Sequence, residues 1–452
     1  MGLDARSEEL LRAIARNPDD NEPRLAFAKH IEAEAPAHAA LIVAQCSGND
    51  DPALVHAFRD ELPQPLRDQE DELDEEELRP VRGFLDRERW TLEQRDFVEI
   101  DPDVLFRVAP SCTTISILDV TDFDAVGARI RRFDTLVLTG THIHSASARR
   151  LAAARGFAHL RQLQLDTTWI DDASLFEVYQ ALPVLERLHV LERRDSEQSR
   201  LEVIRRAACA PSLRELDISG RRDLPPLDLR GFSALRNLTA AQCVLDAGFA
   251  LLPNRFHAVH LTFCELTGGL RAELHESRVF SKLRDLALRG NDAQVETLVV
   301  LLASPHCGPL RSLDVSDFDT YREGSRVPDK NSLYLVQALA NAASSLEQLT
   351  LCISLDDAAQ QELARIPFAR LAWLDVFEAL TPTAAHAFAS APWIRGLREL
   401  SFDISLLDER SARALAGALG PNCQVVPRGE SDEEVFDAFG IASEEIEPTT
   451  EM

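Results

Sequence analysis

The sequence lacks the motifs that carry most enzyme chemistry. Its 452 residues contain no phosphate loop of the GxxxxGK[ST] type, no GxGxxG after a strand, no GxSxG elbow and no HExxH pair. No nucleophile, base and orienting group can be assembled from neighbouring motifs either. We therefore expect a protein that is not an enzyme, with no catalytic residue and no cofactor.

Paired cysteines are also missing. The eight cysteines are spread singly, without a CxxC pair or a Cys/His cluster of zinc spacing. They are typical of reduced, buried thiols in a cytosolic protein. His142 and His144 could place two imidazoles on one strand face, but no third ligand accompanies them. We expect no metal site.

Long apolar runs and a secretory signal are absent too. The longest apolar stretch, residues 298–303, is far too short to span a bilayer. The first ten residues, MGLDARSEEL, have neither the basic nor the apolar region of a signal peptide. These features predict a cytoplasmic protein.

Positive charge is sparse, and negative charge is concentrated. The net charge is −27, of which residues 60–80 carry −8 and residues 430–452 carry −9. Such runs are typical of solvated segments because like charges repel and cannot be buried. Phosphate-binding surfaces need clustered Lys and Arg, whereas pairs such as Arg205-Arg206 are typical of helix ends or loops. We expect no nucleic-acid or membrane partner.

One motif recurs through most of the chain. The pattern L-x-x-L-x-L, with other apolar residues allowed, has clear copies such as LRQLQL from Leu160, LRELDI from Leu213, LRDLAL from Leu283 and LAWLDV from Leu371. Weaker copies begin at Ile115 (ISILDV), Phe133 and Phe256. Twelve starts between residues 115 and 397 give a mean spacing of about 26 residues, within the range of leucine-rich repeats.

The motif predicts a fold. Its fourth and sixth positions alternate with outward residues, as in a short strand, and stacked copies share one core. Helical spacing between copies, as at Leu175, Val178 and Leu182, predicts helices on the other side. We predict an α/β leucine-rich-repeat solenoid, a horseshoe with a parallel concave sheet and helices on its convex side. The repeats resemble the ribonuclease-inhibitor type.

Two cysteines fit the turn that follows a repeat strand. Cys243 and Cys264 stand where leucine-rich repeats usually have Asn or Cys, as does Asn291. A side chain at this position can hydrogen-bond the turning backbone inside the stack. This predicts a structural role for both thiols in preference to a redox role.

Residues 7–45 are expected to form a separate unit. Ser7 could cap a first helix, and the apolar spacing predicts two more. The stretch EELLRAIARNPDDNEPRLAFAKHIEAEAPAHAALIVAQ resembles a bacterial repeat-companion domain that precedes leucine-rich repeats. It departs from that pattern at Lys29-His30 and at residues 35–38. The resemblance implies an architecture and no particular activity.

These segments give a domain plan. Residues 1–58 are expected to form the small α-helical repeat-companion domain. Residues 59–110 form an acidic linker and the lead-in to the repeats. Residues 111–428 form the solenoid of about twelve repeats, and residues 429–452 an acidic tail.

Outward positions of the repeats suggest a binding surface. Third and fifth positions, with some seventh positions, point to the concave face. The candidate protein-binding residues there are Arg187, His189, Glu215, Asp217, Asp285, Asp314, Gln348, Trp373, Asp375, Phe377, Glu399 and Asp403. Trp373 and Phe377 resemble an interface hot spot. The alternative is that Trp373 packs against neighbouring side chains of its own sheet.

We accordingly expect a scaffold that holds an unidentified protein on its concave face. Two alternatives remain open at this stage. One is a regulatory adaptor or enzyme whose activity lies in the N-terminal unit. The other is a structural, self-associating protein, although a monomer is favoured because a polar, acidic segment follows the last repeat.

Overall fold

The computed structural model describes residues 3–68, 80–82, 84–85, 89–139, 143–165, 170–191, 199–221, 223–245, 252, 256–266, 275–290, 294–316, 332–353, 355–429 and 433–440. The chain divides into two compact units, Met1–Leu191 with Arg206–Leu213, and Glu192–Arg205 with Arg214–Met452. We call them the first and second unit and describe each by itself. No described helix is both long and apolar enough to cross a membrane.

The first unit opens with a group of helices. They are α1 (Ala5–Arg16), α2 (Asn21–Ile31), α3 (Pro36–Cys46), α4 (Pro52–Asp60) and α5 (Gln64–Asp68). Asp4 caps α1 by accepting a hydrogen bond from the Ser7 backbone N–H at 2.7 Å. The prediction that Ser7 caps this helix is therefore wrong. Ser7 lies inside the first turn, because Asp4 is the better-placed acceptor three residues earlier.

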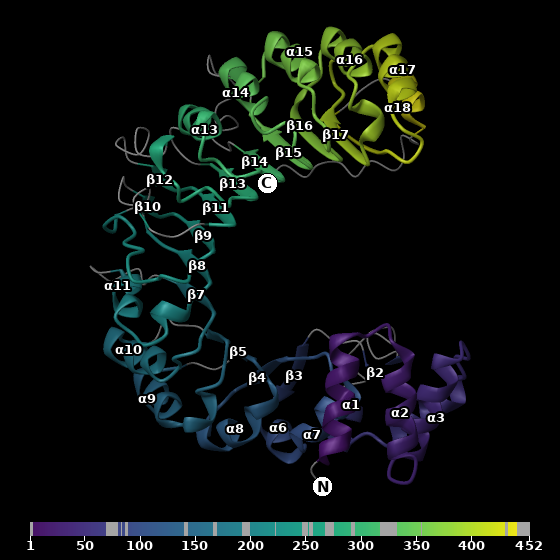
Figure 1. The fold of residues 1–452 in the computed structure, drawn as a ribbon, viewed down its shortest axis with the longest axis vertical. Coiled ribbons are helices and arrows are strands. Elements are labelled where there is room, and N and C mark those ends of the chain that lie inside the picture. The colour runs from purple at the N-terminus through teal and green to yellow at the C-terminus, as the bar shows by residue number, and fades with distance from the viewer. Residues whose placement is uncertain are drawn as a thin grey trace. The chain divides into compact units, whose positions relative to one another are not determined.

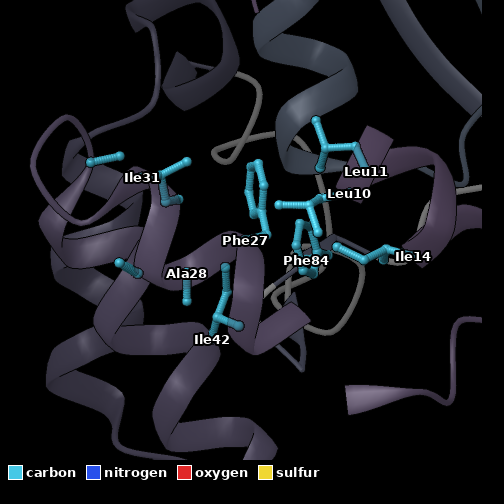
Figure 2. Packing of buried hydrophobic residues seen from close by; sticks show 10 residues of the cluster. Leu10, Leu11, Ile14, Phe27, Ala28, Ile31, Ile42 and Phe84 are labelled. Carbon is cyan, nitrogen blue, oxygen red and sulfur yellow. The ribbon is translucent and has the colours of Figure 1, made fainter. Parts of the chain in front are cut away.

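The helices enclose an apolar core. Leu10, Leu11 and Ile14 of α1 pack with Phe27 of α2, and all four are buried. Phe84 enters this core from a short antiparallel hairpin, β1 (Pro80–Val81) and β2 (Phe84–Leu85). Figure 2 shows its ring beside Phe27.

Five parallel strands follow in the first unit, in the order β3, β4, β5, β6, β7. Their bounds are β3 (Arg89–Glu93), β4 (Thr114–Leu118), β5 (Thr135–Thr139), β6 (Gln162–Leu165) and β7 (Arg187–Leu191). The helical elements of this part are α6 (Gln94–Glu99), α7 (Pro102–Val108), α8 (Phe123–Arg129), η2 (Ile130–Arg132), α9 (Ser145–Ala153), η3 (Arg155–Phe157), α10 (Asp172–Gln180) and η4 (Ala210–Ser212). Strands and helices thus alternate along the chain (Figure 1).

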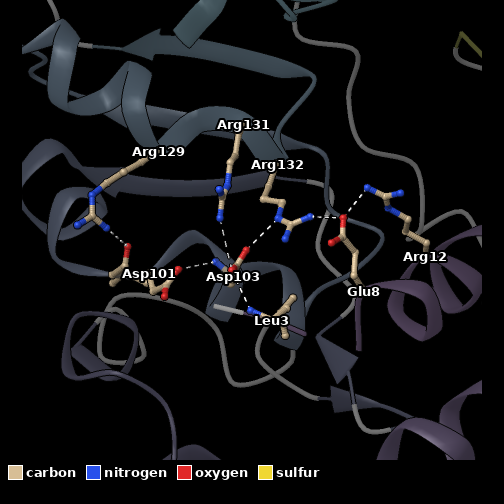
Figure 3. A network of polar contacts seen from close by, with 9 residues as sticks. Leu3, Glu8, Arg12, Asp101, Asp103, Arg129, Arg131 and Arg132 are labelled. Carbon is tan, nitrogen blue, oxygen red and sulfur yellow. Dashed lines mark hydrogen bonds and ion pairs between the residues drawn. The ribbon is translucent and has the colours of Figure 1, made fainter. Parts of the chain in front are cut away.

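A polar network ties the helical group to the first repeats. Asp103 at the start of α7 accepts hydrogen bonds from the Leu3 backbone N–H at 3.0 Å and from Nε of Arg132 at 2.9 Å. Nη1 of Arg132 also donates to Glu8 of α1 at 2.7 Å. Figure 3 shows Arg132 between the two carboxylates. Because Asp103 is buried and fully engaged, this network positions the helical group and does not resemble a reaction site.

The second unit continues the same repeat. Nine parallel strands follow one another in the order β8, β9, β11, β13, β14, β15, β16, β17, β18. They are β8 (Glu215–Ser219), β9 (Asn237–Ala241), β11 (Ala258–Thr262), β13 (Asp285–Arg289), β14 (Ser312–Ser316), β15 (Gln348–Cys352), β16 (Trp373–Ala379), β17 (Glu399–Asp403) and β18 (Gln424–Arg428). A two-stranded ladder joins β10 (Val244–Leu245) and β12 (Glu265–Leu266).

Helices of the second unit pack in sequence on one side of its strands. They are α11 (Arg200–Arg205), α13 (Gln294–Ala303), α14 (Ser332–Leu339), α15 (Asp357–Arg365), α16 (Pro382–Ala389), η7 (Ile394–Gly396), α17 (Glu409–Ala418) and α18 (Glu433–Phe439). In Figure 1, α13 to α17 follow β13 to β17 along the same side. The strands and helices of both units confirm the predicted α/β leucine-rich-repeat solenoid and the small helical unit before it.

The strand register explains the sequence pattern. Fourth and sixth positions, such as Leu313 and Val315 of β14, are buried under the helices. Ile115 pairs with Leu136 and Ile117 with Leu138, so Ile115 occupies a fourth position. The predicted start of this copy at Ile115 is wrong, and the copy begins at Cys112. The register slipped because Ile115 and Leu118 happen to stand three residues apart, as the motif requires.

The structure adds one strand at each end of the predicted series. β3 precedes the first copy, and its Trp90 and Leu92 take the two buried positions. β18 follows the last copy with Val425 and Pro427 opposite Leu400 and Phe402. Beyond it, Phe439 of α18 packs edge-on against Phe402 at 5.7 Å between ring centroids, covering the end of the core.

The two cysteines predicted to serve the turns do so. The Cys243 thiol donates to the Ala241 carbonyl at 3.2 Å, and the Cys264 thiol to the Ala240 carbonyl at 3.3 Å. Both are buried, and all eight cysteines are free. Asn291 lies outside the described residues.

Candidate functional site

The strands of each unit present one face to the helices and leave the other uncovered. We call the second the open face. It carries the third, fifth and seventh positions of each repeat because successive side chains of a strand point to opposite sides. The open face of β14 to β18 holds the densest group of charged and aromatic side chains, and we take it as the candidate site.

The predicted binding residues divide between the units. Arg187 and His189 lie on β7 of the first unit. The other ten lie on the second unit, on β8 (Glu215, Asp217), β13 (Asp285), β14 (Asp314), β15 (Gln348), β16 (Trp373, Asp375, Phe377) and β17 (Glu399, Asp403). Direct pairing places Gln348 beside Trp373, and Trp373 beside Glu399. The structure therefore brings the residues of β15, β16 and β17 together.

Both aromatic residues of β16 are half-buried and lie beneath arginines. The guanidinium of Arg398 lies 5.5 Å from the Trp373 ring, and that of Arg428 lies 4.8 Å from the Phe377 ring. These are cation–π distances. Each ring keeps some exposed surface, but it is shaped by side chains of its own sheet. The packing alternative considered for Trp373 is thus part of what the structure shows.

An ion pair fixes the second arginine. Arg428 approaches Asp375 with both terminal nitrogens, at 2.8 and 2.9 Å, although β17 lies between their strands. Only the 2.9 Å contact has hydrogen-bond geometry. The pair crosses over Ser401, whose side chain is 2% exposed and whose Oγ has no hydrogen-bond partner in the described part of the chain. The arrangement holds Arg428 firmly over Phe377.

A similar pair joins β13 and β14. Arg289 donates to Oδ2 of Asp314 through Nε at 2.8 Å and Nη2 at 2.5 Å. The Ser316 hydroxyl donates to the other oxygen of Asp314 at 2.6 Å. In the strand register, Thr350 lies between Asp314 and Asp375, so one ion-paired carboxylate stands on each side of this uncharged residue.

The Cys352 thiol on this face is not an activated nucleophile. Cys352 lies between the two pairs, and burial raises the pKa of its thiol to about 11 although a hydrogen bond with Ser316 opposes the rise. A thiol of that pKa is protonated at neutral pH and is a poor nucleophile. Within the described ranges, no three His, Cys, Asp or Glu side chains are grouped to hold a metal ion. Of the two histidines that the sequence could place on one strand face, His144 directly precedes α9, and His142 is not among the described residues.

Charge is unevenly distributed on the open face. In the second unit, its strand positions carry seven carboxylates, Glu215, Asp217, Asp285, Asp314, Asp375, Glu399 and Asp403, against the two arginines Arg289 and Arg428. The face is therefore net acidic even after its two internal pairs are formed. A partner with positive charge fits it better than a negatively charged one.

Sequence reasoning missed the three arginines that shape the site. Arg289 occupies the seventh position of LRDLALR, and this position could have identified it. Arg398 occupies the second position of its repeat, which was not considered as part of the face. Arg428 could not be found because the segment of β18, QVVPR, has no leucine pattern.

No family model matches the sequence, and no curated protein matches it at a significant level. Solved structures do align with the fold. The leucine-rich repeat-containing protein LegL7 from Legionella pneumophila is 13% identical with a TM-score of 0.33, covering 74% of this chain and 98% of its own. A structure of the yeast Rad7 and Elc1 complex is 14% identical with a TM-score of 0.38, covering 94% of this chain and 99% of its own. A Bacteroides fragilis protein is 13% identical with a TM-score of 0.26, covering 80% of this chain and 82% of its own.

Proposed function

We propose that the protein is a non-enzymatic scaffold that binds another protein on the open face of its second unit. The observation that carries this proposal is the pair of aromatic rings on β16, each held half-exposed beneath an arginine. Aromatic and arginine side chains are enriched where interfaces concentrate their binding energy. Parallel strands stacked in register also present a preformed surface, which lowers the entropy lost on binding.

The charges around these rings suggest how the partner is oriented. Glu399 lies beside Trp373 in the register, and Asp403 accepts the Ser405 backbone N–H at 2.8 Å. A partner that places an apolar side chain against the rings and cations over these acids would satisfy both features. Arg187 and His189, on the first unit, are proposed as a separate, weaker part of the surface.

Other features of the proposal concern the setting of the scaffold. We assign residues 1–58 to the bacterial repeat-companion type and the repeats to the ribonuclease-inhibitor type, with residues 59–110 as linker and lead-in, 111–428 as repeats and 429–452 as an acidic tail. The eight free thiols support a reducing compartment such as the cytoplasm. A monomer is favoured because β18, an edge strand, contains Pro427, which has no N–H to offer another chain.

Site-specific photocrosslinking tests the binding face. A photoreactive phenylalanine analogue replaces Gln348, which is exposed on the open face, in one protein. In the control it replaces Tyr334, which is 62% exposed on α14 of the helix side. Each is irradiated in lysate of the source organism. We expect a protein adduct from position 348 that is absent from position 334 and weakened by Trp373→Ala/Phe377→Ala. No adduct from 348, or the same adducts from both positions, would contradict the proposal.

A further inference from the structure

A row of basic side chains runs along the start of the strands in the second unit, apart from the open face. The second position of five successive repeats is occupied by Arg214, Arg236, His257, Arg284 and Arg311. Lys282 lies two residues before Arg284. We call these six residues the basic ridge. All are exposed except Arg236, which is half-buried.

The backbone places these residues in register. The Arg236 N–H donates to the Arg214 carbonyl at 2.8 Å, and the His257 N–H to the Arg236 carbonyl at 2.8 Å. The ladder continues from Arg284 to His257 at 2.8 Å and from Arg311 to Arg284 at 2.7 Å. Because neighbouring strands lie about 4.8 Å apart, five rungs make a row of about 19 Å. The spacing is fixed by main-chain bonds and does not depend on the side chains.

The side chains of the ridge also interact electrostatically with one another. Although His257 is exposed, its pKa is lowered, first by partial desolvation of the ring and then by the positive charges of Lys282, Arg236 and Arg284. Neither Arg236, Lys282 nor Arg284 forms an ion pair with any residue in the described ranges. At the far end, Nε of Arg311 comes within 4.0 Å of Glu347, the second-position residue of the next repeat. The ridge is thus a positive strip on a protein of net charge −27.

We propose that the basic ridge binds a short acidic segment of a partner protein in an extended conformation. Guanidinium groups pair with carboxylates through two parallel hydrogen bonds, and a row of them suits a row of acids. An extended segment of about six residues spans about 19 Å, the length of the ridge. The segment must be short because the surrounding protein is acidic and repels negative charge beyond the strip.

Longer polyanions fit the basic ridge less well than a short acidic segment. A nucleic acid or an anionic membrane carries its charge well past the ridge, and the net charge of −27 on the protein repels it there. The ridge uses second positions, whereas the open face uses third, fifth and seventh positions. The inference therefore does not depend on the proposed function, and either can fail alone.

Fluorescence anisotropy with defined probes tests the inference on the full chain. The probe is an octapeptide that alternates glutamate and serine, and its control alternates lysine and serine. Two variants of equal charge change are compared. One is Arg236→Gln/Lys282→Gln/Arg284→Gln on the ridge, and the other is Arg365→Gln/Arg410→Gln/Arg413→Gln on the exposed sides of α15 and α17. Circular dichroism and thermal unfolding establish that both variants are folded.

We expect wild type to bind the acidic peptide more weakly as salt rises. The ridge variant should lose about tenfold in affinity and the helix variant less than about twofold, because only local charges act strongly across solvent. Arg236→Lys/Arg284→Lys, which keeps the charge, should retain most of the binding and covers the case in which the glutamine variant fails to fold. Absence of acidic-peptide binding, or equal losses in both glutamine variants, would overturn the inference. So would tighter ridge-dependent binding of an oligothymidylate or of phosphatidylserine vesicles.

Discussion

The two units build the same repeat but use their charged residues differently. In the first unit, the open-face positions of the middle strands β4, β5 and β6 hold the uncharged residues Thr114, Ser116, Leu118, Thr135, Val137, Thr139, Gln162 and Gln164. Charged or titratable side chains stand on the flanking strands, at Arg89 and Glu93 of β3 and at Arg187 and His189 of β7. The conspicuous ion pairs there lie at the packing of the helical group. In the second unit, charges and aromatic rings line the strand face and a row of cations lines the strand starts. The Glu8, Asp103 and Arg132 pairs thus help to hold the fold of the first unit, whereas we propose that the surface charges of the second unit serve recognition.

The largest effect should come from the close packing of the first unit. A Cβ added at Gly156 of η3 would lie 1.9 Å from the Gly127 carbonyl oxygen of α8, which is backbone and cannot turn aside. Gly156→Ala should lower the free energy of unfolding by about 3 kcal/mol or more. Gly417→Ala in the second unit, where a Cβ meets nothing within 4 Å, is the control and should be neutral or slightly stabilising. Urea denaturation measures both, and similar values would contradict the packing described.

The buried network of the first unit gives the next effect. Burial raises the pKa of Asp103, but bonds from Leu3 and Arg132 outweigh it and leave the pKa below 3.8. Asp103→Asn should cost about 2 kcal/mol of unfolding free energy at neutral pH, because it leaves Arg132 with one carboxylate.

The pH dependence of this cost has a definite sign. A carboxylate with a lowered native pKa contributes stability above its unfolded pKa near 4 and loses it as the pH falls toward the native value. The difference between wild type and Asp103→Asn should therefore shrink below about pH 4. A difference that is constant down to pH 2.5 would argue that the carboxylate charge of Asp103 is not the cause.

Surface pairs of the second unit should matter less for stability. Arg428→Gln removes the contact with Asp375 and the stacking over Phe377, and should cost about 1 kcal/mol. Arg289→Gln breaks a more exposed pair and should cost about 0.5 kcal/mol or less. Chemical denaturation ranks the two. If either substitution lowered the free energy of unfolding as much as Asp103→Asn does, the distinction between buried and surface charges would be contradicted.

The smallest expected effect concerns the basic ridge. Since partial desolvation and then the charges of Lys282, Arg236 and Arg284 lower the pKa of His257, this imidazole gains its proton only below its usual range. An acidic peptide favours the protonated form, so its affinity should rise about twofold between about pH 7.5 and pH 5.5. His257→Gln should abolish this rise. An equal rise in that variant would assign the pH effect to another group.

The sequence was informative where one residue type recurs at one position. Apolar residues at the fourth and sixth positions located twelve strands, with only the copy at Ile115 out of register, because burying them is what stabilises each repeat. The sequence pattern did not identify β18, where Val425 and Pro427 take the fourth and sixth positions, and Arg428 on this strand was therefore missed. Pairing across strands was also invisible, since Asp375 and Arg428 are separated by 53 residues.

The basic ridge shows a second kind of failure. Cations were sought as neighbours in the sequence, such as Arg205-Arg206. The ridge instead takes one cation from each repeat and places them side by side through the main-chain ladder from Arg214 to Arg311. Aligning the repeats and comparing the residues at each position would have identified the basic ridge, because residues at equivalent positions of successive repeats become neighbours in a solenoid.

The central claim is that the rings on β16 bind a protein partner. Its most direct test is calorimetric titration of the partner captured at position 348 into three proteins, namely wild type, Trp373→Ala/Phe377→Ala and the helix-side control Tyr334→Ala. The account predicts a loss of at least about 2 kcal/mol, or about thirtyfold in affinity, for the double variant and no measurable change for the control. Equal affinity for wild type and the folded double variant would contradict it.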